Sequence, residues 1–190
     1  MALLDDAVKK GLLQRARGAI AHAIGADSEP VTPVADPLPS PESLGPADFR
    51  AGAFVTLRIH GALRGCIGYP EPELLLVEVV ERCAVSAATS DPRFPPLSAA
   101  ELSEVDLELS VLGPIEPVRD IREVSVGRHG LVVELAHRRG LLLPQVAAEW
   151  KWDATEFAAQ TCIKAGLPRD AWQKDATLFK FEAEVFGESD

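Results

Sequence analysis

The residues best suited to chemistry lie in one short stretch, Leu63 to Gly68, which reads LRGCIG. It offers a guanidinium at Arg64 and a thiol at Cys66, two residues apart. Residues two apart in a β-strand point to the same face, with about 6.6 Å between their Cα atoms. Because a nearby cation favours the nucleophilic thiolate, Cys66 is the candidate catalytic residue. A general base is missing, since the sequence places no histidine near Cys66.

A β-hairpin over residues 53–69 has to position these groups, because strand-forming residues alternate along its first arm. Gly61-Ala62 is predicted as a two-residue turn, with glycine where φ must be positive. This register pairs Leu57 with Cys66 and Ile59 with Arg64, which places the thiol and the guanidinium on the apolar face. A buried unpaired charge is costly, so we expect Arg64 to meet an anion or to reach a cleft.

Two glycines interrupt the second arm of this hairpin, Gly65 and Gly68. Glycine inside a strand indicates a bulge or the close approach of another backbone or a ligand. Both are therefore candidate substrate-binding positions together with Arg64. The purely structural alternative stays open, because a single cysteine is most often a small core residue.

The segment Ser90 to Leu97, SDPRFPPL, is the second unusual stretch. Its three prolines stiffen the backbone and present Asp91 and Arg93 on a rigid turn. In the functional interpretation Asp91 orients Arg64, and Arg93 holds an anionic substrate in a bidentate manner. In the structural interpretation the segment is only a connector, with Asp91 capping a turn and Phe94 filling the core.

Composition excludes several classes of function. The 190 residues carry a net charge of −10, which disfavours binding to phosphate backbones. The three cysteines fit neither a disulfide framework nor a zinc site, and no motif with metal-ligand spacing occurs. No apolar run is long enough to span a membrane, and the first residues do not match a cleavable signal. We therefore expect reduced thiols and a cytoplasmic location.

The remaining pattern predicts helices separated from antiparallel strands, which is an α+β arrangement. Helices are expected over Leu4 to Ile24, Glu73 to Thr89, Gln145 to Glu149 and Asp153 to Ala165, and strands over Glu104 to Leu112, Leu131 to Ala136, Leu141 to Leu143 and Thr177 to Phe186. Six prolines between Asp27 and Pro46 exclude a regular helix there, so residues 26–47 are predicted to cross the surface in an extended form.

Several motifs together resemble the AMME chromosomal region candidate-protein family. They are LRGCIG, DPRFPPL, GRHGL, RRGLLLPQVA, TCIKAGLP, Trp172 and FEAEVF, in that order from about Gly52 to Phe186. The resemblance implies one α+β domain, an antiparallel β-sheet flanked by helices, with the LRGCIG segment lining a cleft between two lobes. The larger lobe is expected over about 52–112 and 153–187 and the smaller over about 114–150, after an N-terminal helix within 1–25.

The resemblance also implies partners, because bacterial and archaeal members are associated with a Memo-like protein and a radical SAM protein. It leaves the cofactor unknown, and the family has no settled biochemical activity. Two hypotheses follow: a small-molecule or enzyme-component site built on Leu63 to Gly68, and a non-catalytic protein–protein adaptor. RNA binding is less favoured, because the hairpin offers only Phe54 and Tyr69 for base stacking.

Overall fold

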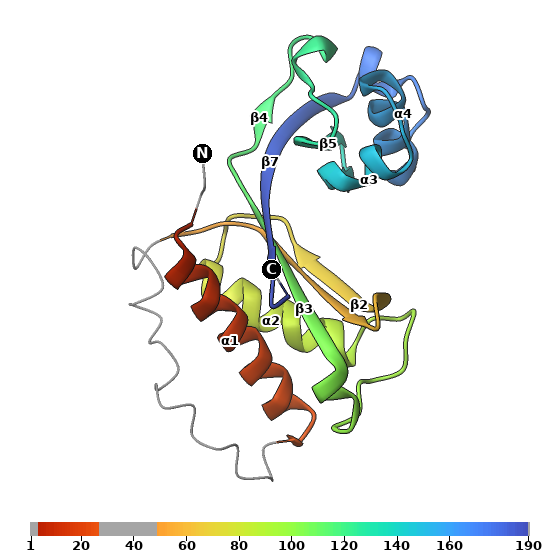
Figure 1. Ribbon diagram of the computed structural model, residues 1–190. Coiled ribbons are helices and arrows are strands. Elements are labelled where there is room, and N and C mark those ends of the chain that lie inside the picture. Colours follow the sequence, from red (N-terminus) through yellow and green to blue (C-terminus); the bar gives the residue numbers. More distant parts are fainter. Residues whose placement is uncertain (1–3, 27–48, 190) are drawn as a thin grey trace. The chain divides into compact units, whose positions relative to one another are not determined.

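The computed structural model describes residues 4–26 and 49–189, and Figure 1 shows its helices and strands. The predicted proline-rich crossing at 26–47 lies almost wholly outside these residues. The described chain divides into two compact units. Unit 1 holds the residues up to Leu112 together with those from Glu184 onward, and unit 2 holds Gly113–Ala183.

The α+β class predicted from the sequence is confirmed, with antiparallel strands and separate helices. Unit 1 contains α1 (Asp6–Ala23), β1 (Ala53–Ile59), β2 (Ala62–Tyr69), α2 (Leu76–Thr89), the 3-10 helix η3 (Glu101–Glu104) and β3 (Val105–Leu112). Unit 2 contains β4 (Glu116–Pro117), η4 (Ile121–Glu123), β5 (His129–Leu135), β6 (Arg138–Leu142), α3 (Pro144–Glu149), α4 (Ala154–Lys164) and η5 (Ala171–Gln173). The last strand, β7 (Thr177–Gly187), begins in unit 2 and ends in unit 1.

Each unit repeats the same order of elements, a hairpin, then helix, then a third strand. In unit 1, β1 pairs with both β2 and β3, and in unit 2, β5 pairs with both β6 and β7, all antiparallel. A glycine in the second hairpin strand lies against helix backbone in both units. A Cβ at Gly65 would stand 2.3 Å from the Ala87 carbonyl oxygen of α2, and one at Gly140 would stand 2.8 Å from the Thr161 carbonyl oxygen of α4.

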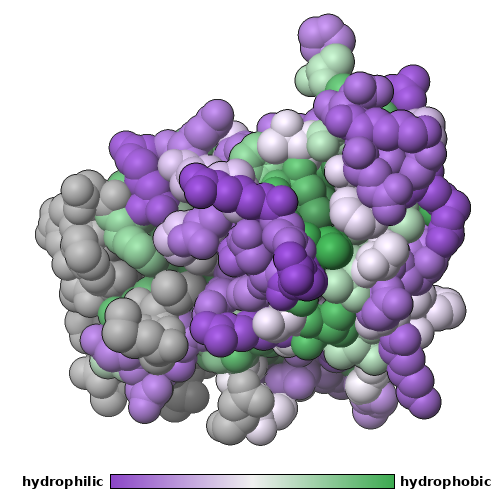
Figure 2. Space-filling model, turned by 90° about the horizontal axis from the view of Figure 1, so that it is seen from above, coloured by the Kyte–Doolittle hydropathy of each residue, from purple (hydrophilic) through white to green (hydrophobic). Residues whose placement is uncertain are grey.

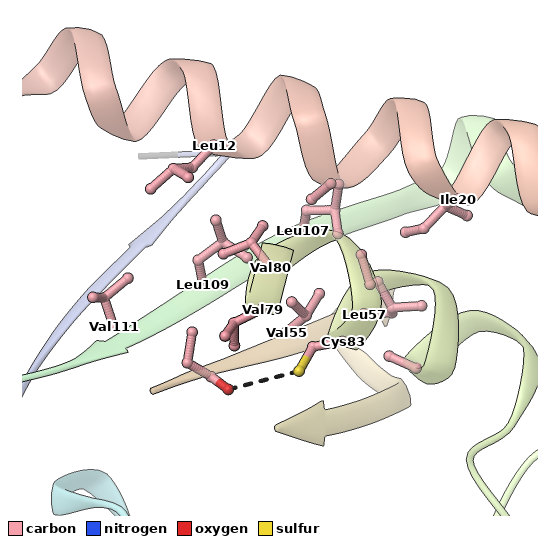
Figure 3. Close-up of a cluster of buried hydrophobic side chains, with 14 of the residues drawn as sticks. Leu12, Ile20, Val55, Leu57, Val79, Val80, Cys83, Leu107, Leu109 and Val111 are labelled. Carbon is pink, nitrogen blue, oxygen red and sulfur yellow. Dashed lines mark hydrogen bonds between the residues drawn. The ribbon is translucent and has the colours of Figure 1, made fainter. Parts of the chain in front are cut away.

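The core of unit 1 lies between the two helices and one face of the sheet (Figure 3). Alternation in β3 places Val105, Leu107, Leu109 and Val111 on that face, as predicted, and all four are buried. Leu12 and Ile20 of α1 and Val79 and Val80 of α2 fill the other side. Ser110 differs from the expectation of a solvent-facing strand surface, because it too is buried on the opposite face.

Unit 2 has a separate core, in which α4 packs on β5 and β6. Phe157, Ala158 and Cys162 of α4 lie against Leu131 and Val133 of β5. Asp153 caps α4 by accepting the Glu156 N–H at 2.7 Å, as the capping-box pattern predicts. Residues 153–183 belong to unit 2, in which the small-residue face of α4 packs where Gly140 has no side chain.

Arg17 of α1 links the residue that follows β7 to the segment that leads into β3. The Arg17 guanidinium of α1 donates to both carboxylate oxygens of Glu188 and to the carbonyls of Leu102 and Val105. Glu188 in turn accepts the backbone N–H of Leu107 at 3.1 Å. Because these contacts join segments far apart in sequence, they fix the end of β7 beside β3.

Candidate functional site

The LRGCIG segment forms most of β2, which is the terminal strand of the unit 1 sheet. Its register differs from the prediction. The turn is His60-Gly61, with φ of 51° and 80°, so that Ile59 pairs with Ala62. Two positive φ values are typical of a type I′ turn, whose twist matches that of the flanking strands. The predicted Gly61-Ala62 turn is therefore wrong by one residue.

A β-bulge follows this turn and decides which side chains face the core. Arg58 pairs with Leu63 and Leu57 pairs with Gly65, which leaves Arg64 as the extra residue. Without the bulge, Arg64 would stand opposite Leu57 and point at helix α2. The bulge places Gly65 there instead, where only a glycine fits under the Ala87 carbonyl.

Cys66 consequently lies on the opposite face from the one predicted. It pairs with Thr56, not Leu57, and neighbouring Ile67 packs into the core in its place. Gly68 is on this outer face as well, opposite Phe54, and a Cβ at Gly68 would stand 2.1 Å from Cδ1 of the Phe54 ring. Close packing thus explains why both positions of the motif are glycine, Gly65 on the core face of the strand and Gly68 on the outer face.

The Arg64 guanidinium forms hydrogen bonds to other residues of the chain. Its carboxylate partner is Glu101, not the predicted Asp91. Its Nε donates to Glu101 Oε1 at 2.9 Å, and Nη1 donates to the Pro95 carbonyl at 2.9 Å. The guanidinium holds the pKa of Glu101 at about 2, with help from the N–H and hydroxyl of Ser98. The sequence carried a signal for this partner, since Ser98 to Glu101 reads SAAE, a capping-box pattern.

Asp91 and Arg93 together hold the outward-facing backbone of Cys66. Asp91 Oδ2 accepts the Cys66 N–H at 2.8 Å, and Arg93 Nη2 donates to the Cys66 carbonyl at 3.1 Å. The two side chains also pair with each other, at 3.0 Å from Arg93 Nε to Asp91 Oδ1 and 2.7 Å from Nη2 to Oδ2. We call these two residues and their bonds to Cys66 the edge clamp.

Burial separates the two members of the edge clamp. The Asp91 side chain is 2% exposed, whereas that of Arg93 is 53% exposed. The Arg93 guanidinium holds the pKa of Asp91 well below its usual range, and the Cys66 N–H contributes in the same direction. The buried carboxylate is therefore ionised and fully used on partners inside the chain.

The Cys66 thiol is the half-buried one of three free thiols, and the other two are buried. The Thr56 hydroxyl donates to its Sγ at 3.4 Å, and no sequence pattern selects Thr56 as a site residue. The Asp91 carboxylate, and to a smaller degree the Cys66 side chain, raises the pKa of Arg93. Burial raises the pKa of Cys83 to about 11 and also raises that of Cys162.

A metal cluster and a membrane-spanning helix are both absent from the described part of the chain. Within it, no group of three or more histidine, cysteine, aspartate or glutamate side chains could hold a metal ion. None of the described helices is long and apolar enough to cross a membrane. His137 is an exposed turn residue, and His129 accepts the Ser125 N–H through Nδ1 at 3.0 Å.

Comparisons with known proteins agree with the family resemblance. The AMMECR1 family model matches residues 13–186. A protein from Methanothermobacter thermautotrophicus is 51% identical over 146 residues, covering 73% of this chain and 76% of its own length. Protein PYRAB00100 from Pyrococcus abyssi is 41% identical over 199 residues, covering 99% and 94% respectively. The crystal structure of the uncharacterized protein PH0010 from Pyrococcus horikoshii is similar with a TM-score of 0.81 and 41% identity, covering 97% of this chain and 93% of that one.

Proposed function

The chain belongs to the AMMECR1 family, and on this premise we propose that it binds a small molecule at the outer face of β2 around Cys66. It does so either as a binding protein or as one component of an enzyme. We place the contact surface at Cys66, Thr56 and Arg93. Arg64, Gly65, Gly68 and Asp91, the other candidates from the sequence, shape and fix this surface from within.

The edge clamp is the observation that carries this proposal. A buried, ionised aspartate is costly unless it is paired and hydrogen-bonded, and here its bonds go to the backbone and the cation beside one cysteine. Binding groups held on regular elements by a supporting network are positioned better than groups on loops. The network fixes the strand position of Cys66 while its half-buried thiol remains on the face away from the core.

We propose ligand binding as the primary role of this surface, and nucleophilic catalysis by Cys66 only as a secondary possibility. Among the described residues, the side chains that form hydrogen bonds to Cys66 are those of Thr56, Asp91 and Arg93, none of which is a histidine. A cysteine nucleophile normally works with an adjacent base. Cys66 therefore remains a candidate nucleophile whose base would have to come from the ligand or from a partner.

Thiol labelling of the native protein tests this proposal directly. A neutral alkylating reagent such as iodoacetamide is expected to modify Cys66 while Cys83 and Cys162 stay unmodified until the protein unfolds, as read by peptide mass spectrometry. A metabolite screen by thermal shift then compares the native protein with Cys66→Ala, with Cys83→Ala as the matched control. If Cys66 reacts only after global unfolding, as the two buried thiols do, the surface is sealed and the proposal fails.

A second candidate function, a non-catalytic adaptor, is favoured by the distribution of charge. Unit 2 has ten basic and ten acidic residues, whereas the described part of unit 1 has nine basic and thirteen acidic residues and is therefore negatively charged. Hydrophilic side chains cover much of the face drawn in Figure 2. An acidic surface favours a partner with a basic one. The family resemblance suggests the Memo-like and radical SAM proteins, and affinity purification from the native organism tests for a stoichiometric complex with either.

RNA binding remains the least supported alternative. The Phe54 ring lies over Gly68 within the sheet, and the Tyr69 hydroxyl donates to Glu73 at 2.7 Å. Both aromatic side chains of the hairpin are therefore engaged inside the chain, whereas single-stranded RNA needs exposed rings for stacking.

A further inference from the structure

Among the large apolar side chains of the described chain, the most exposed is that of Trp150, which follows helix α3 in unit 2. It is 68% exposed, whereas the next in order, Ile163, is 46% exposed. A single exposed leucine or valine needs no explanation, but tryptophan presents far more apolar area to water. Tryptophan is also enriched among the residues that dominate the binding energy of protein interfaces. Trp150 is therefore a candidate contact with another protein.

A second tryptophan supports the Trp150 ring. The ring of Trp152 stacks on that of Trp150, with 6.0 Å between the ring centroids and 17° between the ring planes. Trp152 itself packs against the core of unit 2. One face of the Trp150 ring is thus supported from inside, and its large exposed fraction leaves the other face open to solvent. A rigid aromatic side chain loses little conformational entropy when a partner binds, which makes it an effective anchor.

The end of α3 fixes the two tryptophans in this arrangement. The N–H of Lys151 donates to the Ala148 carbonyl at 3.2 Å, and the N–H of Trp152 donates to the Ala147 carbonyl at 2.9 Å. These two bonds form a Schellman motif, in which Lys151 adopts the left-handed conformation with φ of 55°. Glycine is the usual residue there, because a side chain is strained in this conformation. The turn directs the chain back over the helix end, where Trp152 meets Trp150.

The charged residues around Trp150 indicate which partner fits. Glu149 and Lys151 flank Trp150 in the sequence, and both are exposed. Asp153 adds a second carboxylate, one of whose oxygens accepts the Glu156 N–H. The segment 149–153 therefore carries two acids and one base, within a chain whose net charge is −10. This distribution favours a partner with a positively charged surface.

We infer that Trp150 anchors a protein–protein contact in which the partner presents an arginine. The guanidinium of that arginine lies flat on the open face of the Trp150 ring and pairs with the Glu149 carboxylate. Tryptophan attracts cations more strongly than the other aromatic rings, and the planar guanidinium stacks on it better than an ammonium does. No hydrogen bond or ion pair within the described residues engages the Glu149 carboxylate. The inference goes beyond the proposed function, because none of its residues belongs to the Cys66 surface.

Selection from a library of random peptides displayed on phage tests the inference without knowledge of the natural partner. The native protein is the target, and each selected peptide is then measured against Trp150→Ala by fluorescence polarisation. We expect peptides whose affinity falls at least tenfold in Trp150→Ala, with arginine enriched and aspartate and glutamate depleted in their sequences. Replacing that arginine by citrulline, which has a similar shape but no charge, should lower the affinity about three- to tenfold.

Matched variants separate this contact from general effects of apolar surface and of charge. Ile163→Ala removes the next most exposed apolar side chain and should leave the affinity nearly unchanged. Glu149→Gln should lower the affinity about two- to fivefold, as expected for an exposed ion pair. Lys151→Glu should raise it by a similar factor, because it replaces a repelling charge with an attracting one. Lys164→Glu makes the same change of charge at an exposed position of α4 and should have little effect.

The inference is overturned if no selected peptide depends on Trp150, or if the peptides that do are not enriched in arginine. Equal gains in affinity from Lys151→Glu and Lys164→Glu also overturn it, because the effect then reflects net charge alone. Urea denaturation checks that Trp150→Ala keeps the midpoint of the native protein. The citrulline peptide needs no variant, so its result decides the question even where that midpoint falls. Labelling of Cys66 is a separate measurement, and the proposed function therefore stands or fails independently of these outcomes.

Discussion

The Asp91 carboxylate accepts the outward N–H of Cys66 at 2.8 Å and so joins a proline-stiffened loop to the open edge of the sheet. Arg93 completes the arrangement by donating to the Cys66 carbonyl. The two side chains thus replace the bonds that a further strand would make to this residue. Exposed strand edges are prone to pairing with strands of other chains. By occupying the backbone groups of Cys66, the edge clamp also protects the apolar part of β2 from such pairing.

Removal of the Asp91 carboxylate should destabilise unit 1. In Asp91→Ala the Cys66 N–H loses its acceptor and Arg93 loses its partner, for an expected loss of about 1–3 kcal/mol in the free energy of unfolding. Asp91→Asn should lose less, because its amide oxygen still accepts from Cys66. Urea denaturation of both variants checks this, and equal losses would show that the bond to Cys66 contributes nothing.

The two glycines of β2 should respond differently to a second mutation at Phe54. Gly68→Ala places its methyl group against the Phe54 ring, and Gly65→Ala places its own against the Ala87 carbonyl. Each should cost about 1–3 kcal/mol through overpacking. In double-mutant cycles Phe54→Ala should relieve the cost of Gly68→Ala and leave that of Gly65→Ala unchanged. Additive losses in both cycles would contradict the assignment of the two residues to opposite faces.

The ion pair between Arg64 and Glu101 should make stability depend on pH at the acid end. The pKa of Glu101 is about 2 in the folded chain, against 4.5 as its ordinary value. A lowered pKa in the folded state means that the contribution is complete above pH 4.5 and disappears as the pH falls towards 2. After allowance for solvent screening of a partly exposed carboxylate, about 1 kcal/mol is expected.

The free energy of unfolding measured from pH 6 to pH 2.5 checks this contribution. The unaltered protein should lose more stability over this range than Glu101→Gln, and the two curves should converge at low pH. Glu149→Gln, an exposed position in unit 2, provides the control for loss of a carboxylate. Parallel curves for Glu101→Gln and the unaltered protein would contradict the prediction.

Protonation of His129 should open the turn that precedes β5. Burial lowers the pKa of His129, with further lowering by Lys180 and Arg128, while Glu182 and Glu116 act in the opposite direction. The neutral ring is needed in the fold, because Nδ1 accepts the Ser125 N–H. Its contribution to stability is therefore present above about pH 6.5, the ordinary pKa, and is lost as the pH falls below that value.

Amide hydrogen exchange at Ser125, corrected for the intrinsic effect of pH, measures this opening. Protection should fall between pH 7 and pH 5 in the unaltered protein. In His129→Gln it should be low throughout or independent of pH. His137→Gln, at an exposed turn, should behave as the unaltered protein does. Protection of Ser125 that stays constant down to pH 5 would contradict the role given to the His129 ring.

Local patterns in the sequence determined the elements themselves. The alternation of Val105, Leu107, Leu109 and Val111 predicted a strand with one buried face, and the Asp153 cap predicted the start of α4. The order of motifs identified the family and its α+β class. These features depend on residues within a turn or two of each other, where propensity, capping and periodicity act directly.

Tertiary structure alone decided how the chemical groups of the site are combined. His60-Gly61 and Gly61-Ala62 both satisfy the local rules for a turn, and exchanging one for the other changes the pairing by two residues, which leaves the faces of β2 unchanged. The bulge at Arg64 adds one residue and moves Cys66 and the residues after it to the other face. In the observed register the bulge places Gly65 under α2, where a larger residue would collide with the Ala87 carbonyl. The bulge directs Arg64 to Glu101, 37 residues away in the chain, while the edge clamp brings Arg93 to Cys66. Sequence spacing predicted the wrong arginine because such contacts depend on packing between distant segments, which no local pattern encodes.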